Sequence, residues 1–341
     1  MKGWKLKSEE NLILEELTEV SPTETGADIC KVKITKALIT TSDVLRYMGE
    51  LPCENVVLGS YGLGIVSDPG SNLFGLEKGK HVYVENYKPC TQCYNCKNGE
   101  ENKCSNLQIA GEDYNGFLSD FVQIDSSKLF LLPESVSDYE ALFIGHISLA
   151  LSIIDKMGIQ KGDYVAVIGA SNLGIILSQL LIYYQAVPIL ISNYQENIDI
   201  AKNSGIYYTL GENDNWAKEV AALTGGRMAK HVVYFSESNI HANKAFAVAS
   251  FNADLAFTGE SYKNTPISFT QAIKKQLDIH CINASSGNTA ASINLIANKA
   301  IDLSHLKLDT TTYDAVPETF EKMKQTLEEK EIVSETIIDL M

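Results

Sequence analysis

The chain has 341 residues, 45% of them hydrophobic, which predicts two domains or one large one and argues against disorder. Its net charge of −15 disfavours a nucleic-acid surface, because such a surface needs a basic footprint. The first ten residues lack the apolar core of a signal peptide, and the apolar stretch 173–184 is too short to cross a bilayer. The sequence therefore predicts a cytoplasmic protein with neither nucleic-acid nor membrane partners.

The first 146 residues predict a β-rich domain, because short β-prone segments alternate there with Gly, Pro and Asn turns. The expected strands are residues 29–35, 56–66, 81–84 and 117–124.

Four cysteines interrupt this domain in the spacing C-x2-C-x2-C-x7-C: Cys90, Cys93, Cys96 and Cys104. Four thiolates on one short loop are typical of a closed tetrahedral zinc site with no open position for chemistry. The alternative is an iron–sulfur cluster, but the ferredoxin run continues with x3-C-P, whereas here the gap is seven and Ser105 follows. Zinc is favoured, and a metal cluster with an odd total of seven cysteines indicates a reducing compartment.

After residue 146, strand and helix patterns alternate, which predicts a parallel sheet with helices on both faces. The near-continuous apolar runs fit strands that are covered on both sides. The expected strands are residues 164–168, 188–191, 231–235, 255–257 and 277–282, and the expected helices are residues 173–184, 196–204, 216–223 and 242–250.

The turn after the first of these strands stands in the place of the dinucleotide fingerprint G-x-G-x-x-G. Its residues are Gly169, Ala170, Ser171, Asn172, Leu173 and Gly174. Gly169 would make the tight turn, Gly174 would let the helix approach the strand, and the helix N-terminus would hold a pyrophosphate. Ser171 replaces the middle glycine, and its hydroxyl can bond a phosphate oxygen instead. The alternative is an ordinary strand-to-helix turn in a sheet that binds nothing.

The end of the second strand bears on the choice between NAD and NADP. NAD binding favours an acidic residue there, which bonds the ribose 2′-hydroxyl. The strand instead ends in Ser192, Asn193 and Tyr194, which tolerate a 2′-phosphate although no arginine is present to hold it. NADP is therefore favoured over NAD, and both remain open.

Motifs spread over most of the chain resemble the zinc-containing alcohol dehydrogenase family, part of the medium-chain dehydrogenase/reductase superfamily. Residues 79–82 resemble its G-D-x-V, the cysteine segment matches its structural-zinc lobe, and residues 115–122 resemble G-G-F-A-E-Y-V. Residues 159–169 resemble I-K-P-G-D-x-V-L-V-x-G, residues 201–205 resemble A-K-x-x-G, and residues 315–320 fit a C-terminal return segment.

The resemblance implies an α/β fold with two parts. A GroES-like catalytic domain would span residues 1–146, with the structural-zinc lobe at 88–106, and a Rossmann domain, a doubly wound parallel sheet, would span 147–281. Residues 282–341 would return to complete the catalytic domain. The resemblance also implies a small-molecule substrate and a homodimer or homotetramer.

The ligands of the family's catalytic zinc are not matched. The family holds that ion with a Cys in G-I-C-G-S-D, a His in G-H-E and a Cys or Glu near the domain crossover. Here Thr40 stands at the cysteine, Ser60 and Tyr61 stand at the His-Glu pair, and Gly145 stands at the third position, beside His146. Hydroxyls and one imidazole make a poor zinc site, so we expect no catalytic zinc.

Without that Lewis acid, the resemblance favours reduction of an activated alkene, quinone or carbonyl with NADP or NAD. The candidate catalytic residues are Thr40, Ser42, Asp43 and Tyr61. Ser42 matches a proton-relay hydroxyl of the family, and Thr40 and Asp43 match the N-x-x-D region of its metal-free quinone reductases. Alternatively, the Ser-Asp pair caps a helix and Tyr61 only packs. The second function hypothesis is a catalytically silent nucleotide- or partner-binding homologue that keeps the structural zinc.

Overall fold

The computed structural model divides the chain into two compact units, Met1–Gly145 with Lys307–Met341 (unit 1) and His146–Leu306 (unit 2). The division falls after the second residue of helix α5 (Ile144–Met157). The residues that the structure describes are 1–18, 28–53, 55–71, 75–212, 214–235, 242–259, 267–283, 287–329 and 333–341.

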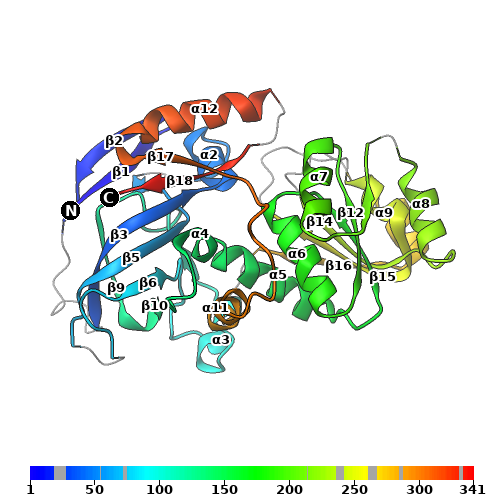
Figure 1. The fold of residues 1–341 in the computed structure, drawn as a ribbon, viewed down its shortest axis with the longest axis horizontal. Helices are drawn as coiled ribbons and strands as arrows, with labels where there is room; N and C mark the ends of the chain where they lie inside the picture. Colours follow the sequence, from blue (N-terminus) through cyan, green and yellow to red (C-terminus); the bar gives the residue numbers. More distant parts are fainter. Residues whose placement is uncertain are drawn as a thin grey trace. The chain divides into compact units, whose positions relative to one another are not determined.

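A seven-stranded sheet forms the centre of unit 1 (Figure 1). Its longest strand, β3 (Ile29–Ile39), pairs antiparallel with β5 (Tyr61–Asp68), β9 (Phe121–Asp125) and β18 (Glu335–Asp339). The pairing of β3 with β18 brings the C-terminal segment of the chain into the N-terminal sheet. The remaining strands of this sheet are β6 (His81–Val84), β10 (Leu129–Leu131) and β17 (Leu308–Thr312).

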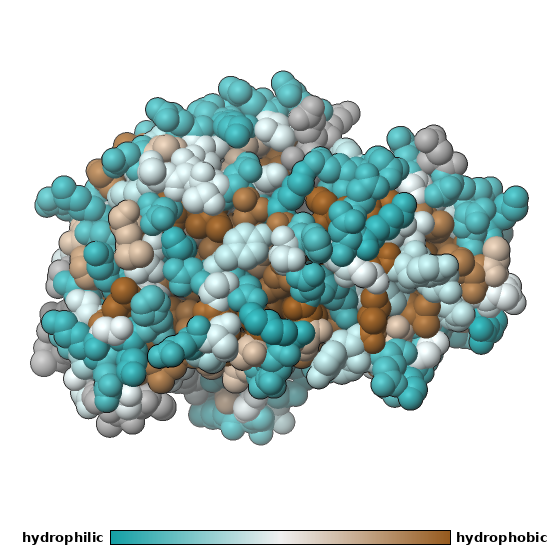
Figure 2. Space-filling model, viewed as in Figure 1, coloured by the Kyte–Doolittle hydropathy of each residue, from teal (hydrophilic) through white to brown (hydrophobic). Residues whose placement is uncertain are grey.

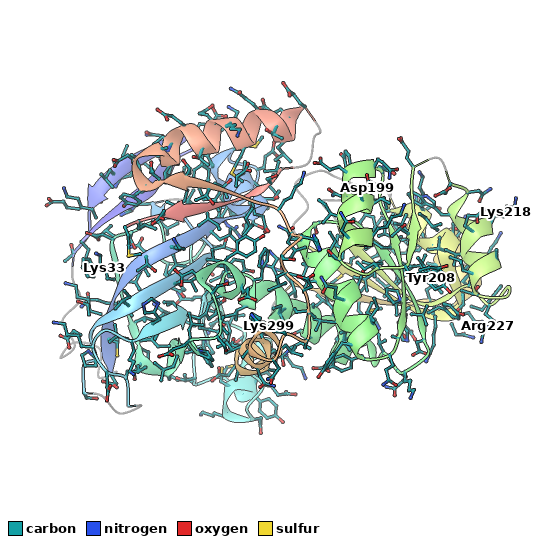
Figure 3. The ribbon with its side chains drawn as sticks, viewed as in Figure 1. Lys33, Asp199, Tyr208, Lys218, Arg227 and Lys299 are labelled. Carbon is teal, nitrogen blue, oxygen red and sulfur yellow. The ribbon has the colours of Figure 1, made fainter. Side chains whose placement is uncertain are left out.

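The pattern of β3 follows the two-residue period of a strand that is buried on one face. Val32 and Ile34 are fully buried, whereas Lys33 between them is exposed and points away from the core (Figure 3). The two apolar side chains join one core cluster with residues of β5, β6 and the C-terminal segment. Burial of this face therefore sets the register of the unit 1 sheet.

Smaller elements complete unit 1. A three-stranded sheet contains β1 (Lys2–Ser8), β2 (Asn11–Glu16) and β4 (Val56–Val57). The cysteine lobe contains β7 (Tyr87–Lys88), α3 (Tyr94–Lys97), η1 (Glu101–Lys103) and β8 (Gln108–Ile109). The helices outside the lobe are α2 (Thr41–Tyr47), η2 (Ser126–Lys128), α4 (Asp138–Ala141) and α12 (Val316–Glu328). Helix α12 packs on α2 and buries Val316, Phe320 and Met323 at helical spacing, while hydrophilic side chains cover its outward face (Figure 2).

Two expected strands of unit 1 are shorter in the structure. The segment 56–66 breaks between β4 and β5, because Gly59 adopts a φ of 103° that ends the extended conformation. The segment 117–124 becomes a strand only at Phe121, because the residues before it bond elsewhere: the Phe117 amide donates to the Gly59 carbonyl. Both differences arise at one place, where the two segments meet.

Unit 2 contains a six-stranded sheet whose strands are all parallel. In spatial order the strands are β13 (Tyr208–Leu210), β12 (Val187–Ile191), β11 (Tyr164–Ile168), β14 (Ala229–Phe235), β15 (Ala249–Thr258) and β16 (Asp278–Ile282). Counted along the chain, this order is 3-2-1-4-5-6, the arrangement of dinucleotide-binding doubly wound sheets. The predicted fold class is confirmed.

Helices cover both faces of this sheet. On one face, Phe246 of α9 (Asn243–Val248) packs against Phe257 of β15, which contacts Tyr234. Phe235 follows Tyr234 on β14, so its side chain lies on the other face of the sheet. Helix α6 (Asn172–Tyr183) lies on that face, because a Cβ atom on its Gly174 would be 3.5 Å from Phe235. The other helices of unit 2 are α7 (Gln195–Asn203), α8 (Trp216–Leu223), α10 (Phe269–Lys275) and α11 (Thr289–Ala297). No helix within the described ranges is long and apolar enough to span a membrane.

Several boundaries in unit 2 differ from expectation, and two of them, the starts of β15 and of the return segment, differ by more than two residues. The helix expected over 242–250 ends at Val248, and Ala249 already belongs to β15. The return segment expected from residue 282 begins at Lys307. The intervening residues stay with unit 2 because the side chain of Gln179 in α6 holds their backbone. Its NH2 group donates to the Asp302 carbonyl at 2.8 Å, and its oxygen accepts from the Asp302 amide at 2.7 Å.

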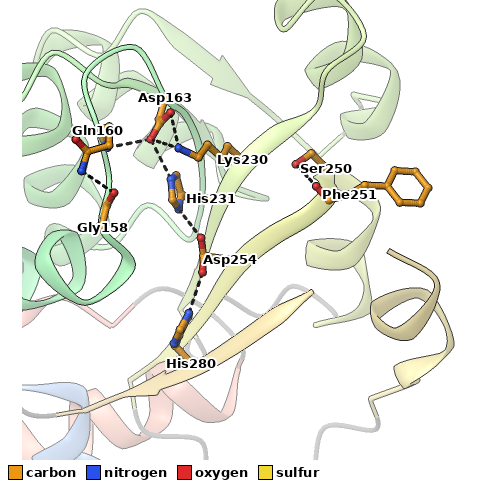
Figure 4. A network of polar contacts seen from close by, with 9 residues as sticks. All are labelled: Gly158, Gln160, Asp163, Lys230, His231, Ser250, Phe251, Asp254 and His280. Carbon is orange, nitrogen blue, oxygen red and sulfur yellow. Dashed lines mark hydrogen bonds and ion pairs between the residues drawn. The ribbon is translucent and has the colours of Figure 1, made fainter. Parts of the chain in front are cut away.

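A polar network crosses the sheet of unit 2 near the amino-terminal ends of its strands (Figure 4). Asp163, just before β11, accepts hydrogen bonds from Lys230 and faces Nε2 of the buried His231 at 3.1 Å. Asp254 of β15 lies 3.4 Å from the other ring nitrogen of His231 and 3.0 Å from His280. The network therefore links the amino-terminal edge of four neighbouring strands, at the end of the sheet opposite to the glycine turn.

Candidate functional site

The four cysteines of the lobe converge on one point of unit 1. Their sulfur atoms all lie within 4.8 Å of one another, and all four thiols are free of disulfides. In the described part of the chain, this is the one cluster of three or more His, Cys, Asp or Glu side chains with the spacing of a metal site. The structure thus brings together the residues that the cysteine spacing predicted.

The sulfur separations match those of a tetrahedral zinc site. Cys93 and Cys96 lie 3.4 Å apart, and the Cys90–Cys96 and Cys93–Cys104 pairs are each 4.0 Å apart. Four sulfurs at the usual Zn–S length of about 2.3 Å would be separated by about 3.8 Å. The geometry therefore fits one structural zinc ion.

Backbone amides also prepare the sulfurs for a cation. The amides of Cys90 and Asn106 donate to the sulfur of Cys104 at 3.3 and 3.4 Å, and the amide of Cys93 donates to that of Cys90 at 3.4 Å. These backbone bonds lower the pKa of Cys104 and favour the thiolate, which is the form that binds metal. A metal bound here would hold the short elements of the lobe together.

The first and last positions of the glycine turn of unit 2 both favour glycine, for different reasons. Gly169 has a φ of 115°, which favours glycine. A Cβ atom on Gly174 would lie 2.1 Å from the Gly169 carbonyl oxygen, so the start of α6 touches the end of β11. This close approach is what a phosphate-binding turn requires, because it aims the free amides of the helix at one point.

Ser171, at the N-cap of α6, carries a polar atom that fits a phosphate group. Its hydroxyl oxygen is buried and has no hydrogen-bond partner among the described residues. Such an atom is costly unless something bonds it, and a phosphate oxygen would do so. Ser171 therefore fits the role that the sequence assigned to it in place of the middle glycine.

The end of β12 lies beside this turn, since the Gly169 amide donates to the Ile191 carbonyl at 2.9 Å. Ser192 is buried and accepts a hydrogen bond from the Tyr194 amide at 3.1 Å, which shapes the tip. The side-chain oxygen of Asn193 is buried without a partner in the described ranges. The tip therefore offers polar atoms, and no carboxylate, where an adenosine ribose would bind.

The candidate catalytic residues of unit 1 form a cluster around Asp43, which is fully buried in α2. Its carboxylate accepts from the amide and hydroxyl of Thr40, both at 2.9 Å, from the Ser60 hydroxyl at 2.8 Å and from the Gly59 amide at 3.0 Å. A carboxylate has about four lone-pair sites, so these four donors fill it. Burial raises the pKa of Asp43, while hydrogen bonds from Thr40 and the charge of Arg46 oppose this.

The hydroxyls at this cluster differ in whether their protons are already bonded to Asp43. The hydroxyl protons of Thr40 and Ser60 both point to the same oxygen of Asp43, so neither is left for a substrate. Ser42, half-buried one residue before Asp43, has no side-chain hydrogen bond within the described ranges. The Asp43 carboxylate therefore engages the hydroxyls of Thr40 and Ser60, and it accepts no hydrogen bond from Ser42.

The ring of Tyr61 fills the space beside Gly145. A Cβ atom on Gly145 would lie 2.0 Å from Cε1 of Tyr61, which is closer than any real contact. Tyr61 begins β5 directly after Ser60, and β5 is paired to β3, so the ring is held in place. A cysteine or glutamate could not occupy position 145 while this tyrosine remains.

The sequence did not reveal two partners of this cluster. Ser60 was assigned only as a lost ligand, yet it bonds Asp43. Arg46, whose side chain is 5% exposed, forms an ion pair with Glu112, which lies 66 residues further along the chain. A buried arginine on a short helix implies a carboxylate partner, but nothing in the sequence indicates which one.

Comparison with known proteins gives consistent results. Residues 26–134 match the alcohol dehydrogenase GroES-like domain. A zinc-type alcohol dehydrogenase-like protein of Haemophilus influenzae is 25% identical over 92% of both chains. A solved structure of a short chain alcohol dehydrogenase from Escherichia coli with NADH has a TM-score of 0.84, is 21% identical and covers 100% of this chain and 99% of its own.

A zinc-binding dehydrogenase from Sinorhizobium meliloti, solved with NADP, has a TM-score of 0.85, is 18% identical and covers 99% of both chains. At such identities the two structures establish the fold. Fold, motifs and comparisons together define a dinucleotide-dependent oxidoreductase of the alcohol dehydrogenase type.

The resemblance of the motifs to the zinc-containing alcohol dehydrogenase family of the medium-chain dehydrogenase/reductase superfamily is confirmed by the GroES-like domain match and by the zinc-type alcohol dehydrogenase-like relative. The predicted cofactors, NAD(P) and a structural zinc, agree with this family, with the glycine turn and with the four-cysteine cluster.

Proposed function

We propose that this protein is an NAD(P)H-dependent reductase that acts on an activated alkene, quinone or carbonyl without a catalytic zinc. The observation that carries the proposal is the cluster of Asp43, Thr40 and Ser60. It occupies the positions at which the family resemblance places two ligands of a catalytic zinc. The third position, Gly145, has no side chain and is closed by Tyr61.

The donor atoms at these positions argue against a metal. Zinc takes thiolate, imidazole or carboxylate ligands, and Thr40 and Ser60 offer only neutral hydroxyls. Asp43 is the one anion in the cluster, but both its oxygens already accept hydrogen bonds from backbone amides. Binding a cation there would leave those buried amides without partners.

The remaining residues suit hydride addition to an electron-poor double bond. The cofactor, held by residues 169–174 and the end of β12, would supply the hydride. The hydroxyls of Ser42 and Tyr61 would donate hydrogen bonds to the negative charge that develops on the acceptor oxygen, each worth about 2–4 kcal/mol by analogy with oxyanion-hole donors. Thr40 and Asp43 would position the start of α2. The absence of an acid at the end of β12 favours NADPH over NADH.

A substrate panel after metal chelation tests the proposal. Treatment with a chelator that spares the thiolate lobe should leave NADPH-dependent reduction of enones or quinones intact, and oxidation of ethanol or sugar alcohols should be weak. A Ser42→Ala, Tyr61→Phe double variant should lose at least about a hundredfold in kcat. A Thr319→Val variant is the control, because this hydroxyl caps a turn of α12 by bonding the Ala315 carbonyl. Zinc-dependent oxidation of alcohols would refute the proposal.

The cofactor titration decides between this function and the silent homologue. If neither NADPH nor NADH binds below millimolar concentration, the reductase proposal fails. The replacement of the middle glycine by Ser171 is the observation that favours the silent homologue, because its Cβ narrows the approach of a pyrophosphate to the backbone.

A further inference from the structure

One buried hydroxyl in unit 2 belongs to none of the residues discussed so far. Thr258 is the last residue of β15, and its side chain is 2% exposed. Its Oγ1 atom has no hydrogen-bond partner in the described part of the chain. Buried polar groups are almost always satisfied, so an unsatisfied one indicates a missing partner.

The position of Thr258 relates it to the glycine turn. Thr258 is the register partner of Phe235 on the adjacent strand β14, so the two side chains lie on the same face of the sheet. Phe235 in turn approaches Gly174 on that face, at 3.5 Å from the position of a Cβ atom. The hydroxyl therefore lies at the carboxyl end of the sheet, on the side that carries α6, two strands or about 10 Å from β11.

Two other polar atoms at this end of the sheet share the same property. The hydroxyl oxygen of Ser171 and the side-chain oxygen of Asn193 are also buried without partners among the described residues. They lie after β11 and β12, where the pyrophosphate and the adenosine ribose bind in this type of sheet. Thr258 lies on the opposite side of the turn, beyond β14.

A dinucleotide lies across the carboxyl ends of such a sheet, with its two halves on either side of the glycine turn. If the adenosine half lies over β12, the nicotinamide riboside half lies over β14 and β15. We propose that the Thr258 hydroxyl forms a hydrogen bond with a polar group of the nicotinamide riboside, either a ribose hydroxyl or the carboxamide. Thr258 is then a cofactor-binding residue, an inference that rests on the proposed function.

The melting temperature of a Thr258→Val variant separates a cofactor-binding hydroxyl from a structural one. Replacing Thr258 with valine keeps the shape of the side chain and removes a hydroxyl that is unsatisfied in the free protein. The free variant should therefore melt at the same temperature as the wild type or higher, although its cofactor binding is weaker. A hydroxyl with a purely structural role would give the reverse.

Thr224 provides the matched control in the same unit. It is fully buried, its hydroxyl donates to the Val220 carbonyl at 2.7 Å, and it accepts from the Met228 amide at 2.9 Å. Both its hydrogen bonds are made within the protein. Thr224→Val should therefore lower the melting temperature of the free protein and leave cofactor affinity unchanged.

The experiment compares three ligands by calorimetry: NADPH, ADP-ribose and AMP. We expect Thr258→Val to bind NADPH about tenfold more weakly than the wild type and AMP equally well, because AMP lacks the nicotinamide riboside half. A tenfold loss that persists with ADP-ribose assigns the partner to the ribose, and a loss confined to NADPH assigns it to the nicotinamide; both results support the inference.

Equal affinity of Thr258→Val and wild type for NADPH would overturn the inference and leave the proposed function intact. A loss of AMP affinity would also overturn it, because the effect would then reach the adenosine half. If the wild type binds no dinucleotide at all, the proposed function itself fails, so the two failures are distinguishable.

Discussion

Replacing Asp43 with asparagine should destabilise unit 1, although the two side chains have the same shape. The carboxylate accepts from the Gly59 amide through one oxygen and from the Thr40 amide and two hydroxyls through the other. An asparagine NH2 group must take one of these two places. In either orientation, it then faces a backbone N–H that can only donate.

The size of the effect follows from that one mismatch. With the NH2 group toward Gly59, one buried amide loses its acceptor, and with the group toward Thr40, the hydroxyls can turn but the amide cannot. One unsatisfied buried N–H costs about 1–3 kcal/mol. Asp43→Ala leaves both amides unsatisfied, so it should cost about 2–6 kcal/mol.

The two tryptophans allow unit 1 to be followed alone. Trp4 lies in unit 1, where its ring nitrogen donates to the Tyr313 carbonyl at 2.9 Å, and Trp216 lies in unit 2. In a Trp216→Phe background, urea unfolding monitored by tryptophan fluorescence reports the free energy of unfolding of unit 1. Asp43→Asn should lower this free energy by about 1–3 kcal/mol with an unchanged m value.

An Asp43→Asn variant as stable as its parent would refute the reasoning, because the four donors would then not depend on a full acceptor. Ser60→Ala separates the contributions. It removes one donor and no acceptor, so it should cost less than about 1.5 kcal/mol. A larger loss for Ser60→Ala than for Asp43→Asn would also contradict the cluster as described.

Three further outcomes are expected. Purified protein should contain about one zinc per chain by elemental analysis, and Cys96→Ser should release it; two zinc ions per chain would contradict the absence of a catalytic site. Gly174→Ala should abolish dinucleotide binding in a fluorescence titration, because its Cβ would lie 2.1 Å from the Gly169 carbonyl, whereas Gly211→Ala, with its nearest neighbour at 3.8 Å, should bind normally. Burial lowers the pKa of His231 below its reference value of 6.5, so the unfolded chain takes up a proton first and stability falls as the pH drops from 7 to 5. His231→Gln should make this fall in melting temperature shallower, and equal slopes would show that another group is responsible.

The sequence was most informative about unit 2. The strand at 164–168 and the helix at 216–223 have the predicted bounds, because buried parallel strands are continuous apolar runs and amphipathic helices repeat every 3.6 residues. The position of the return at Lys307 could not be read in this way. It depends on the bonds between Gln179 and Asp302, which join residues far apart in the chain.

Contacts between residues far apart in the chain also limited what could be predicted about the sites. The cysteine lobe and the glycine turn were predictable because each is a motif of neighbouring residues with fixed spacing. The cluster around Asp43 joins residues of α2 to residues around position 60, and its fourfold hydrogen bonding has no local signal. Thr258 carried no signal at all, because a threonine at the end of an apolar strand is ordinary until its hydroxyl is found without a partner.

The contact between Tyr61 and Gly145 has a consequence for the order in which substitutions could restore a metal site. Introducing a cysteine at position 145 first would force its Cβ atom to within 2.0 Å of the tyrosine ring, so this change is costly unless Tyr61 is already smaller. Shrinking Tyr61 first would leave a cavity that nothing yet fills. Thr40 and Ser60 would also have to change, and each of those changes disturbs the hydrogen bonds of Asp43. Every first step toward a zinc site therefore lowers stability before the ligand set is complete, so a gain of zinc chemistry requires several substitutions made together.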